Sequence, residues 1–164
     1  MARKPLALAK VTQPRLHDVL ARTRLFEAID AALRRPVLWL SAQPGAGKTT
    51  LVASYLQARD KDRKGHTLWY QVDDGDADPA SFIYHLRLAA ESLTSADAVA
   101  GLPLLTPEYL ADLRGFARRF FRELYAQLDA GALLVLDNFQ EVPEGSAFHR
   151  PVSYTHLRAH ETDS

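Results

Sequence analysis

A glycine-rich segment with the sequence SAQPGAGKTT (residues 41–50) carries the residue types that bind a polyphosphate. A loop that surrounds phosphates with backbone N–H groups needs glycine where the main chain approaches most closely, and Gly45 and Gly47 stand there. Lys48 would supply positive charge to the β and γ phosphates, and the hydroxyl of Thr49 would hold Mg²⁺. The segment therefore predicts a nucleotide site of the Walker A type.

One position departs from the usual pattern G-x-x-x-x-G-K-[ST], because Ala42 replaces the first glycine. Ala42 lies upstream of the closest approach to phosphate, and a methyl group is tolerated there if the local φ is negative. We therefore expect the loop to bind nucleotide, with Ala46 between the two glycines and Thr50 adding a contact to the α phosphate.

The second half of such a site is an acidic residue at the C-terminal end of another buried strand. The run LLVLD (residues 133–137) ends in Asp137, which is expected to bind Mg²⁺ through water beside Thr49. This is the Walker B position, and Lys48 and Asp137 are the candidate catalytic residues. The alternative interpretation of Asp137 is an ordinary turn residue at the end of a strand.

The residue after Asp137 bears on the rate of hydrolysis. Many hydrolytic P-loop ATPases have a glutamate there that activates water, whereas this chain has Asn138, which is a poor base. Glu141 lies three residues further on and could substitute for it. The sequence thus predicts a site that binds nucleotide and turns it over slowly, as a switch-type ATPase at most.

Hydrophobic patterns predict the elements that would position these residues. Apolar runs predict buried strands at residues 37–41, 67–72 and 132–137. Helical spacing predicts one helix or two short ones over about 16–33. It also predicts helices after Thr49, from Asp78 and Pro79 to near Thr94, and over 116–128. Residues 94–107 are expected to be irregular, with a short helix as an option at 107–113.

Strands that alternate with helices predict an α/β fold, in which right-handed crossovers build a parallel sheet with helices on both faces. The order of elements is that of a P-loop NTPase, here truncated after the Walker B strand. We expect a lead-in (1–14), a partial nucleotide-binding domain (15–148) and a tail (149–164) that is non-native or disordered. His156 and His160 in the tail are interpreted as exposed side chains rather than metal ligands.

Composition excludes several classes of function. The 164 residues carry 20 basic and 20 acidic side chains, so no net charge directs the chain toward nucleic acid or an anionic membrane. The absence of cysteine excludes disulfides, thiolate catalysis and cysteine-based metal sites. No apolar run approaches the roughly 18 residues that span a bilayer, so a cytoplasmic protein of one domain is expected.

Four blocks of the sequence together resemble the nucleotide-binding domain of the MalT-type large ATP-binding regulators, which are LuxR-related members of the STAND class of signal-transduction ATPases. The blocks are AKVTQPRLHDVLARTRLFEAID, LWLSAQPGAGKTTLVASYL, LWYQVDDGDADPASFIYHL and LLVLDNFQEV, and the similarity extends over about residues 8–148. Alanine at the first loop position is common in that family, which accounts for Ala42.

The resemblance implies an ATP/ADP switch, in which ATP and an inducer favour an oligomerising form and ADP holds a monomer. It also implies that residues 19–24 flank the adenine, where Arg22 or Arg24 would match the family's arginines. Solvated helix charges are the alternative role for these two arginines. The acidic stretch 73–78 matches a family block after the second strand, and we interpret it as a turn and a helix cap.

The family continues beyond this region with further strands, a winged-helix module, helical repeats and usually a DNA-binding helix-turn-helix. The sequence is therefore interpreted as an N-terminal fragment. DNA binding and self-association are expected only of a full-length parent, with DNA bound through a C-terminal domain absent here.

Two other functions stay open. A small-molecule P-loop kinase fits the length, but it would need an arginine-bearing lid, and residues 94–114 hold one arginine, Arg114. A nucleotide-holding interaction domain without catalysis is the second alternative, and Asn138 makes it credible. A transporter ATPase is disfavoured because no L-S-G-G-Q-like signature occurs.

Overall fold

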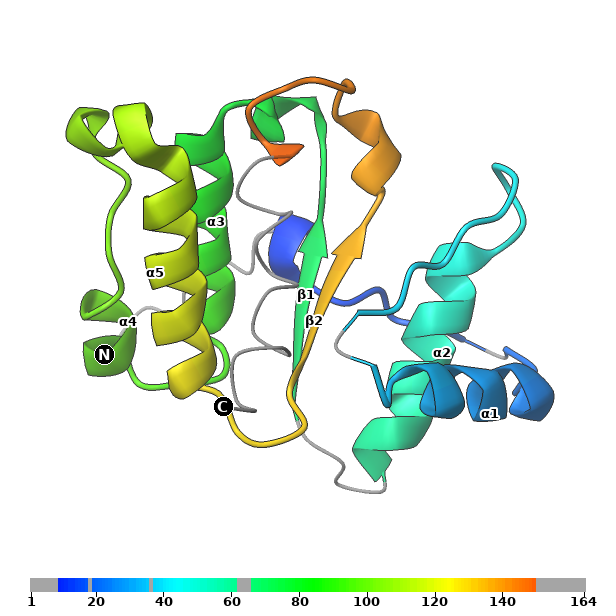
Figure 1. Cartoon of the computed structure of the whole chain (residues 1–164). Coiled ribbons are helices and arrows are strands. Elements are labelled where there is room, and N and C mark those ends of the chain that lie inside the picture. Colours follow the sequence, from blue (N-terminus) through cyan, green and yellow to red (C-terminus); the bar gives the residue numbers. More distant parts are fainter. Residues whose placement is uncertain (1–8, 18, 36, 62–65, 150–164) are drawn as a thin grey trace.

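The computed structural model describes residues 9–17, 19–35, 37–61 and 66–149, which form a two-stranded parallel sheet with helices on both faces (Figure 1). Strand β1 (Thr67–Gln71) pairs with β2 (Leu133–Asp137), so that Gln71 lies opposite Asp137. A hydrogen bond of 2.8 Å from the Val72 N–H to the Asp137 carbonyl continues the pairing past the strand end. This arrangement is compatible with the predicted α/β class.

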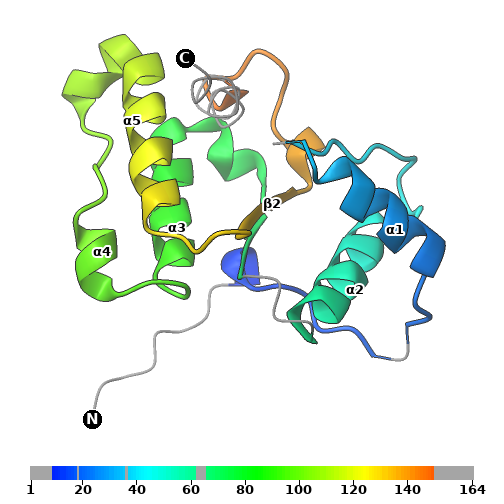
Figure 2. The ribbon, with the colours of Figure 1, turned by 60° about the horizontal axis from the view of Figure 1, so that its bottom comes forward.

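Helices α3 (Pro79–Ala90) and α5 (Leu113–Ala126) cover one face of the sheet (Figures 1 and 2). Successive side chains of a strand point to opposite faces, so every second residue of each strand packs here. The core on this face comprises Leu68 and Tyr70 of β1, Leu134 and Leu136 of β2, Phe82, Ile83 and Leu86 of α3, and Phe116, Phe120, Phe121 and Leu124 of α5. The apolar stripe that predicted α5 is the face that it buries.

Helices α1 (Thr23–Ala32) and α2 (Lys48–Lys61) pack against the opposite face. The hydroxyl of Tyr55 in α2 donates to Asp30 Oδ1 in α1 at 2.7 Å and joins the two helices. Burial, together with the Asp30 carboxylate, raises the pKa of Tyr55 to about 12. The core on this face comprises Trp69 of β1, Leu133 and Val135 of β2, Ile29 of α1, and Ala53, Tyr55 and Leu56 of α2.

The predicted start of α3 is confirmed. Pro79 is the first helical residue, and the carboxylate of Asp78 accepts hydrogen bonds from the N–H groups of Ala80 (3.3 Å) and Ser81 (3.2 Å). Residues 73–78 therefore form the turn and helix cap that the sequence predicts, and α5 has a corresponding cap in Asp112.

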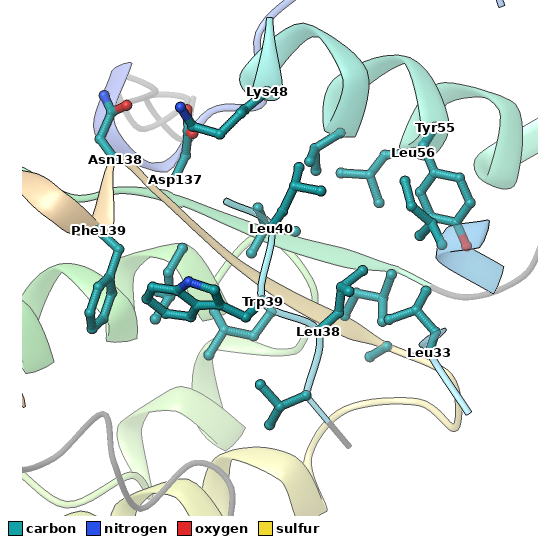
Figure 3. Close-up of a pocket in the computed structure, with 18 of the residues that line it drawn as sticks. Leu33, Leu38, Trp39, Leu40, Lys48, Tyr55, Leu56, Asp137, Asn138 and Phe139 are labelled. Atoms are coloured by element: carbon teal, nitrogen blue, oxygen red, sulfur yellow. The ribbon is translucent and has the colours of Figure 1, made fainter. Parts of the chain in front are cut away.

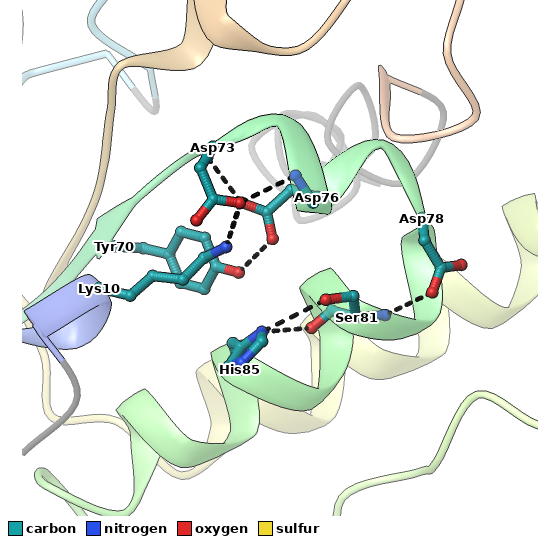
Figure 4. Close-up of polar contacts among 8 residues, drawn as sticks. Lys10, Tyr70, Asp73, Asp76, Asp78, Ser81 and His85 are labelled. Atoms are coloured by element: carbon teal, nitrogen blue, oxygen red, sulfur yellow. Dashed lines mark hydrogen bonds and ion pairs between the residues drawn. The ribbon is translucent and has the colours of Figure 1, made fainter.

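The N-terminal segment is held against β1 by four side chains, Lys10, Tyr70, Asp73 and Asp76, which we call the lysine network (Figure 4). Lys10 Nζ lies 2.7 Å from Asp73 Oδ1 and 2.8 Å from Asp76 Oδ2. Asp76 is fully buried and also accepts a 2.6 Å hydrogen bond from the Tyr70 hydroxyl. The hydrogen bond from Lys10 lowers the pKa of Asp73, and burial raises the pKa of Tyr70.

The predicted strand at residues 37–41 is wrong. These residues have no regular secondary structure, and Trp39 among them is 67% exposed. An apolar cavity of about 620 Å³ lies between this segment and β2, in the place where a third strand would pair (Figure 3). The described residues therefore contain two of the three expected strands, and the P-loop arrangement of the sheet stays a prediction.

Other elements differ from expectation in their bounds. The helix expected over 16–33 begins only at Thr23, and Leu20 in the preceding segment is 87% exposed. Residues 94–107, expected to be irregular, contain the short helix α4 (Ala96–Ala100). The described residues also contain the 3₁₀ helices η1 (Ala9–Val11), η2 (Asp74–Ala77), η3 (Pro107–Asp112) and η4 (Phe139–Glu141).

Some predictions fall outside the described residues, namely those on residues 1–8 of the lead-in and on 150–164 of the tail with His156 and His160. Just before that tail, Phe148 is fully buried and its ring contacts those of Phe82 and Phe139. None of the helices in the described residues combines the length and the hydrophobicity of a membrane span.

Candidate functional site

The glycine loop (residues 42–47) leads directly into α2. Gly45 and Gly47 have φ angles of +78° and +80°, in the left-handed region that favours glycine. The reason for glycine is conformational, because a Cβ at either position would meet no described atom within 4 Å. Helix α2 begins at Lys48, so the loop lies at a helix N-terminus, where exposed N–H groups favour anions.

The first two side chains of α2 make polar contacts around the loop. Lys48 Nζ donates to the carbonyl of Ala42 at 3.0 Å and to that of Gln43 at 3.4 Å, which keeps the ammonium group over the loop. Thr49 Oγ1 lies 3.0 Å from both carboxylate oxygens of Asp137 and donates to them. The latter contact joins the glycine loop to the C-terminal end of β2.

A cavity of about 350 Å³, which we call the loop cavity, opens beside the glycine loop. Its walls are Pro44, Gly45, Gly47, Lys48, Thr49, Asn138 and Gln140. Asn138 has a left-handed backbone, with φ 59° and ψ 32°, and the turn η4 follows it. This turn places Asn138 and Gln140 across from the loop, whereas Glu141 does not line the cavity.

The larger apolar cavity adjoins the loop cavity (Figure 3). Leu38, Trp39 and Leu40 form part of one wall, and residues of β2 form another. Lys48, Asn138 and Gln140 line both cavities, so the polar end of the apolar cavity lies at the glycine loop.

The other predicted loop residues lie close by. The Ala46 N–H donates to the Gln43 carbonyl at 3.2 Å, which tightens the loop. Thr50 is exposed in the first turn of α2. The structure thus gathers residues 42–50 and Asp137 at one end of the sheet, and the binding role of each stays a prediction.

The two predicted adenine-flanking arginines lie elsewhere. Arg22 directly precedes α1 and Arg24 is in its first turn; both are exposed and line neither cavity. Their role toward a nucleotide stays a prediction as well.

Gln140 and the lysine network were not predicted from the sequence. The sequence singles out Asn138 and Glu141, whereas in the structure Asn138 and Gln140 line the loop cavity and Glu141 does not. A usable signal was an asparagine directly after a buried strand, because asparagine enters the left-handed region more readily than most residues. After such a turn, the next two side chains, here those of Phe139 and Gln140, point in different directions.

The donor set at the loop fits a nucleotide with Mg²⁺. Backbone N–H groups and an ammonium group suit phosphate oxygens. The Thr49 hydroxyl and the Asp137 carboxylate are the hard oxygen donors that Mg²⁺ accepts, and Mg²⁺ usually needs few of them because it also binds phosphate and water. Among the described residues, no group of three or more His, Cys, Asp or Glu could hold a metal ion by protein ligands alone.

Comparison with known proteins gave one family and several relatives. The family model described as "Nephrocystin 3, N-terminal" matches residues 18–155. The chain is 28% identical over 156 residues to the HTH-type transcriptional regulator MalT of Vibrio parahaemolyticus, covering 90% of this chain and 17% of the relative. It is 29% identical over 132 residues to MalT of Vibrio cholerae, covering 80% of this chain and 14% of the relative. No solved structure matches the chain.

These relatives confirm the resemblance that the sequence predicts. The chain spans about 17% of the length of the MalT regulators that it matches over 156 residues. The family match extends over most of the chain and includes the glycine loop, Asp137 and Gln140. The chain therefore belongs to the nephrocystin 3 N-terminal family, and its curated relatives are MalT-type transcriptional regulators.

Proposed function

We propose that the chain is an ATP/ADP-binding switch region of a signal-responsive transcriptional regulator. The names of its relatives, HTH-type transcriptional regulators, support the regulatory part of the proposal. The nucleotide part is supported by one observation above all, the 3.0 Å contact of the Thr49 hydroxyl with the Asp137 carboxylate beside the glycine loop. DNA binding and self-association would belong to other parts of a longer regulator.

Each polar group has its own task in this proposal. The N–H groups of the glycine loop surround the phosphates, and Lys48 exchanges loop carbonyls for the β and γ phosphates. Thr49 and Asp137 would hold Mg²⁺, which would supply positive charge to offset that of the phosphates. Asn138 cannot take a proton from water as a glutamate does, so the ATP-bound state persists. A turnover of tens per second would overturn this slow hydrolysis.

The test is nucleotide binding, measured by isothermal titration calorimetry with MgATP and MgADP. Lys48→Ala is expected to weaken binding by about ten- to a hundredfold, because a hydrogen bond to a charged group contributes roughly 1.5–3 kcal/mol. The matched control is Arg34→Ala, which removes one exposed positive charge that lines neither cavity and should leave affinity unchanged. Undiminished affinity in Lys48→Ala would refute the site.

A second arm of the same experiment separates the metal from the phosphates. Thr49→Ala and Asp137→Asn are expected to bind ATP in EDTA as the wild type does, but to lose most of the affinity that Mg²⁺ adds. Full Mg²⁺ dependence in both variants would contradict the metal role of the pair.

A further inference from the structure

Gln140 is a polar side chain of the loop cavity to which the proposed nucleotide site gives no task. The loop side of the cavity carries Lys48 and Thr49, which have phosphate and metal roles in the proposal. The opposite wall carries Asn138 and Gln140, which reach the cavity from the end of β2. A ligand held by the loop would therefore meet Gln140 on its far side.

The backbone that carries Gln140 is fixed by its neighbours. Asn138 turns the chain with its φ of 59°, and the Glu141 N–H closes the turn by donating to the Asn138 carbonyl at 2.9 Å. Between them, the ring of Phe139 packs edge-on against Trp39, with 5.1 Å between centroids. Because Phe139 is anchored in aromatic contacts, Gln140 is presented to the cavity by a held turn rather than by a free loop.

The chemistry of Gln140 suits an anion. Its carboxamide Nε2 is a neutral donor, whereas a carboxylate in the same place would repel phosphate. The neighbouring carboxylate of Glu141 lies outside the cavity and accepts a hydrogen bond from Gln140 Nε2 at 3.4 Å. Both side chains are exposed, so Nε2 can exchange this long contact for a phosphate oxygen.

The place of Gln140 relative to Asp137 decides which phosphate it meets. The contact of Thr49 with Asp137 is where the residues that would hold Mg²⁺ come together, and such a metal would accompany the terminal phosphates. Gln140 follows Asp137 by three residues, on the wall across from the loop. We propose that Gln140 Nε2 contacts the terminal phosphate of a bound triphosphate and so distinguishes ATP from ADP, an inference that rests on the proposed function.

The experiment compares affinities rather than hydrolysis. Titration calorimetry gives the dissociation constants of MgADP and of the slowly hydrolysed analogue adenylyl imidodiphosphate with Mg²⁺. In Gln140→Ala, the affinity for the analogue is expected to fall about tenfold, the effect of one hydrogen bond to a charged group, while MgADP affinity is unchanged. Gln140→Glu should lower analogue affinity further by repulsion and again leave MgADP unaffected. Glu144→Ala, which removes an exposed carboxylate that lines neither cavity, should change neither.

The possible results separate the role of Gln140 from the proposed nucleotide site. An unchanged ratio of the two affinities in Gln140→Ala and Gln140→Glu, or an equal loss for both nucleotides, would overturn the role of Gln140 while leaving the nucleotide site standing. Failure of the wild type to bind either nucleotide would overturn the proposed function and this inference with it. Thermal melting of each variant checks that the fold is intact, as expected for an exposed side chain.

Discussion

Lys10 is a nearly buried cation, with only 14% of its side chain exposed, and two carboxylates balance its charge. Burial of an ion is costly unless it is paired, and removal of one partner leaves the other uncompensated. Because Asp76 is fully buried and also bonded to Tyr70, the network ties residues 9–11 to β1 through charge rather than apolar contact alone. At the scale of residues, this network is an electrostatic contact that lies outside the glycine loop.

A pH dependence follows from Asp73. Its pKa is lowered from the ordinary 3.8 mainly by the hydrogen bond from Lys10, so the folded state binds this proton more weakly than the unfolded state. The stabilisation is complete above the unfolded pKa and is lost as the pH falls through the lowered folded value. Urea denaturation between about pH 6 and pH 2 is expected to show a steeper loss of stability for the wild type than for Asp73→Asn.

The matched control for that measurement is Asp74→Asn, which removes an exposed neighbouring carboxylate outside the lysine network. It should retain the steep acid loss of the wild type. If Asp73→Asn loses stability with pH as steeply as the wild type does, the pairing with Lys10 is not the cause.

At the scale of elements, the helices and the paired strands could be predicted because the hydrophobic pattern of each element shows which of its residues are buried. Helix α5 has one apolar face and β1 has a run of aromatic and β-branched residues. The start of α3 was predictable to the residue, because Asp78 and Pro79 act locally through backbone donors and a fixed φ.

Residues 37–41 are a segment for which the hydrophobic pattern predicts the wrong structure. An apolar run indicates burial, but the pairing of a strand depends on a partner far away in sequence. Here the run lines an apolar cavity beside β2 and forms no ladder. No local pattern in the run distinguishes the two outcomes.

The cap of α3 gives a prediction at this scale. Asp78→Ala removes the acceptor for two N–H groups in the first turn and is expected to destabilise the fold by about 1 kcal/mol, measured by urea denaturation. Asp78→Asn keeps a side-chain oxygen at the same position and should recover most of the loss. Equal losses in the two variants would mean that the carboxylate charge, rather than the capping geometry, is what matters.

At the scale of the whole molecule, one large core lies on the α3 and α5 side of the sheet and a smaller one on the α1 and α2 side. The larger core extends to Phe148, far along the chain from the helices that surround it. The turn after β2 is therefore packed against the larger core. This packing also holds the backbone of Asn138 and Gln140, the two residues of the turn that line the loop cavity.

Phe148→Ala tests this extension. The side chain is fully buried against the rings of Phe82 and Phe139, so its truncation is expected to cost about 3–5 kcal/mol of unfolding free energy. Tyr84→Ala, on the exposed side of α3, is the aromatic control and should cost roughly 0.5 kcal/mol or less. A loss for Phe148→Ala no larger than that of the control would show that the core ends before this residue.

The candidate site was predictable in part. A glycine loop and an aspartate at the end of a strand can be recognised from residue type alone. The structure brings Thr49 and Asp137 into contact, as the sequence suggests. The wall formed by Gln140 could not be read in the same way, because it depends on the sign of one backbone angle at Asn138. The turn that begins with the positive φ of Asn138 leaves Asn138 and Gln140 in the wall of the loop cavity and Glu141 outside it.

The contact between Thr49 and Asp137 joins residues 88 positions apart, and this separation has a consequence during synthesis. A ribosome that adds about 5–20 residues per second needs roughly 4–18 s to make Asp137 after Thr49 has left its catalytic centre. Through that interval the nascent chain holds the glycine loop but not the residue that completes it. A newly made chain would thus gain the contact between Thr49 and Asp137 only after this interval, whatever the glycine loop does before it.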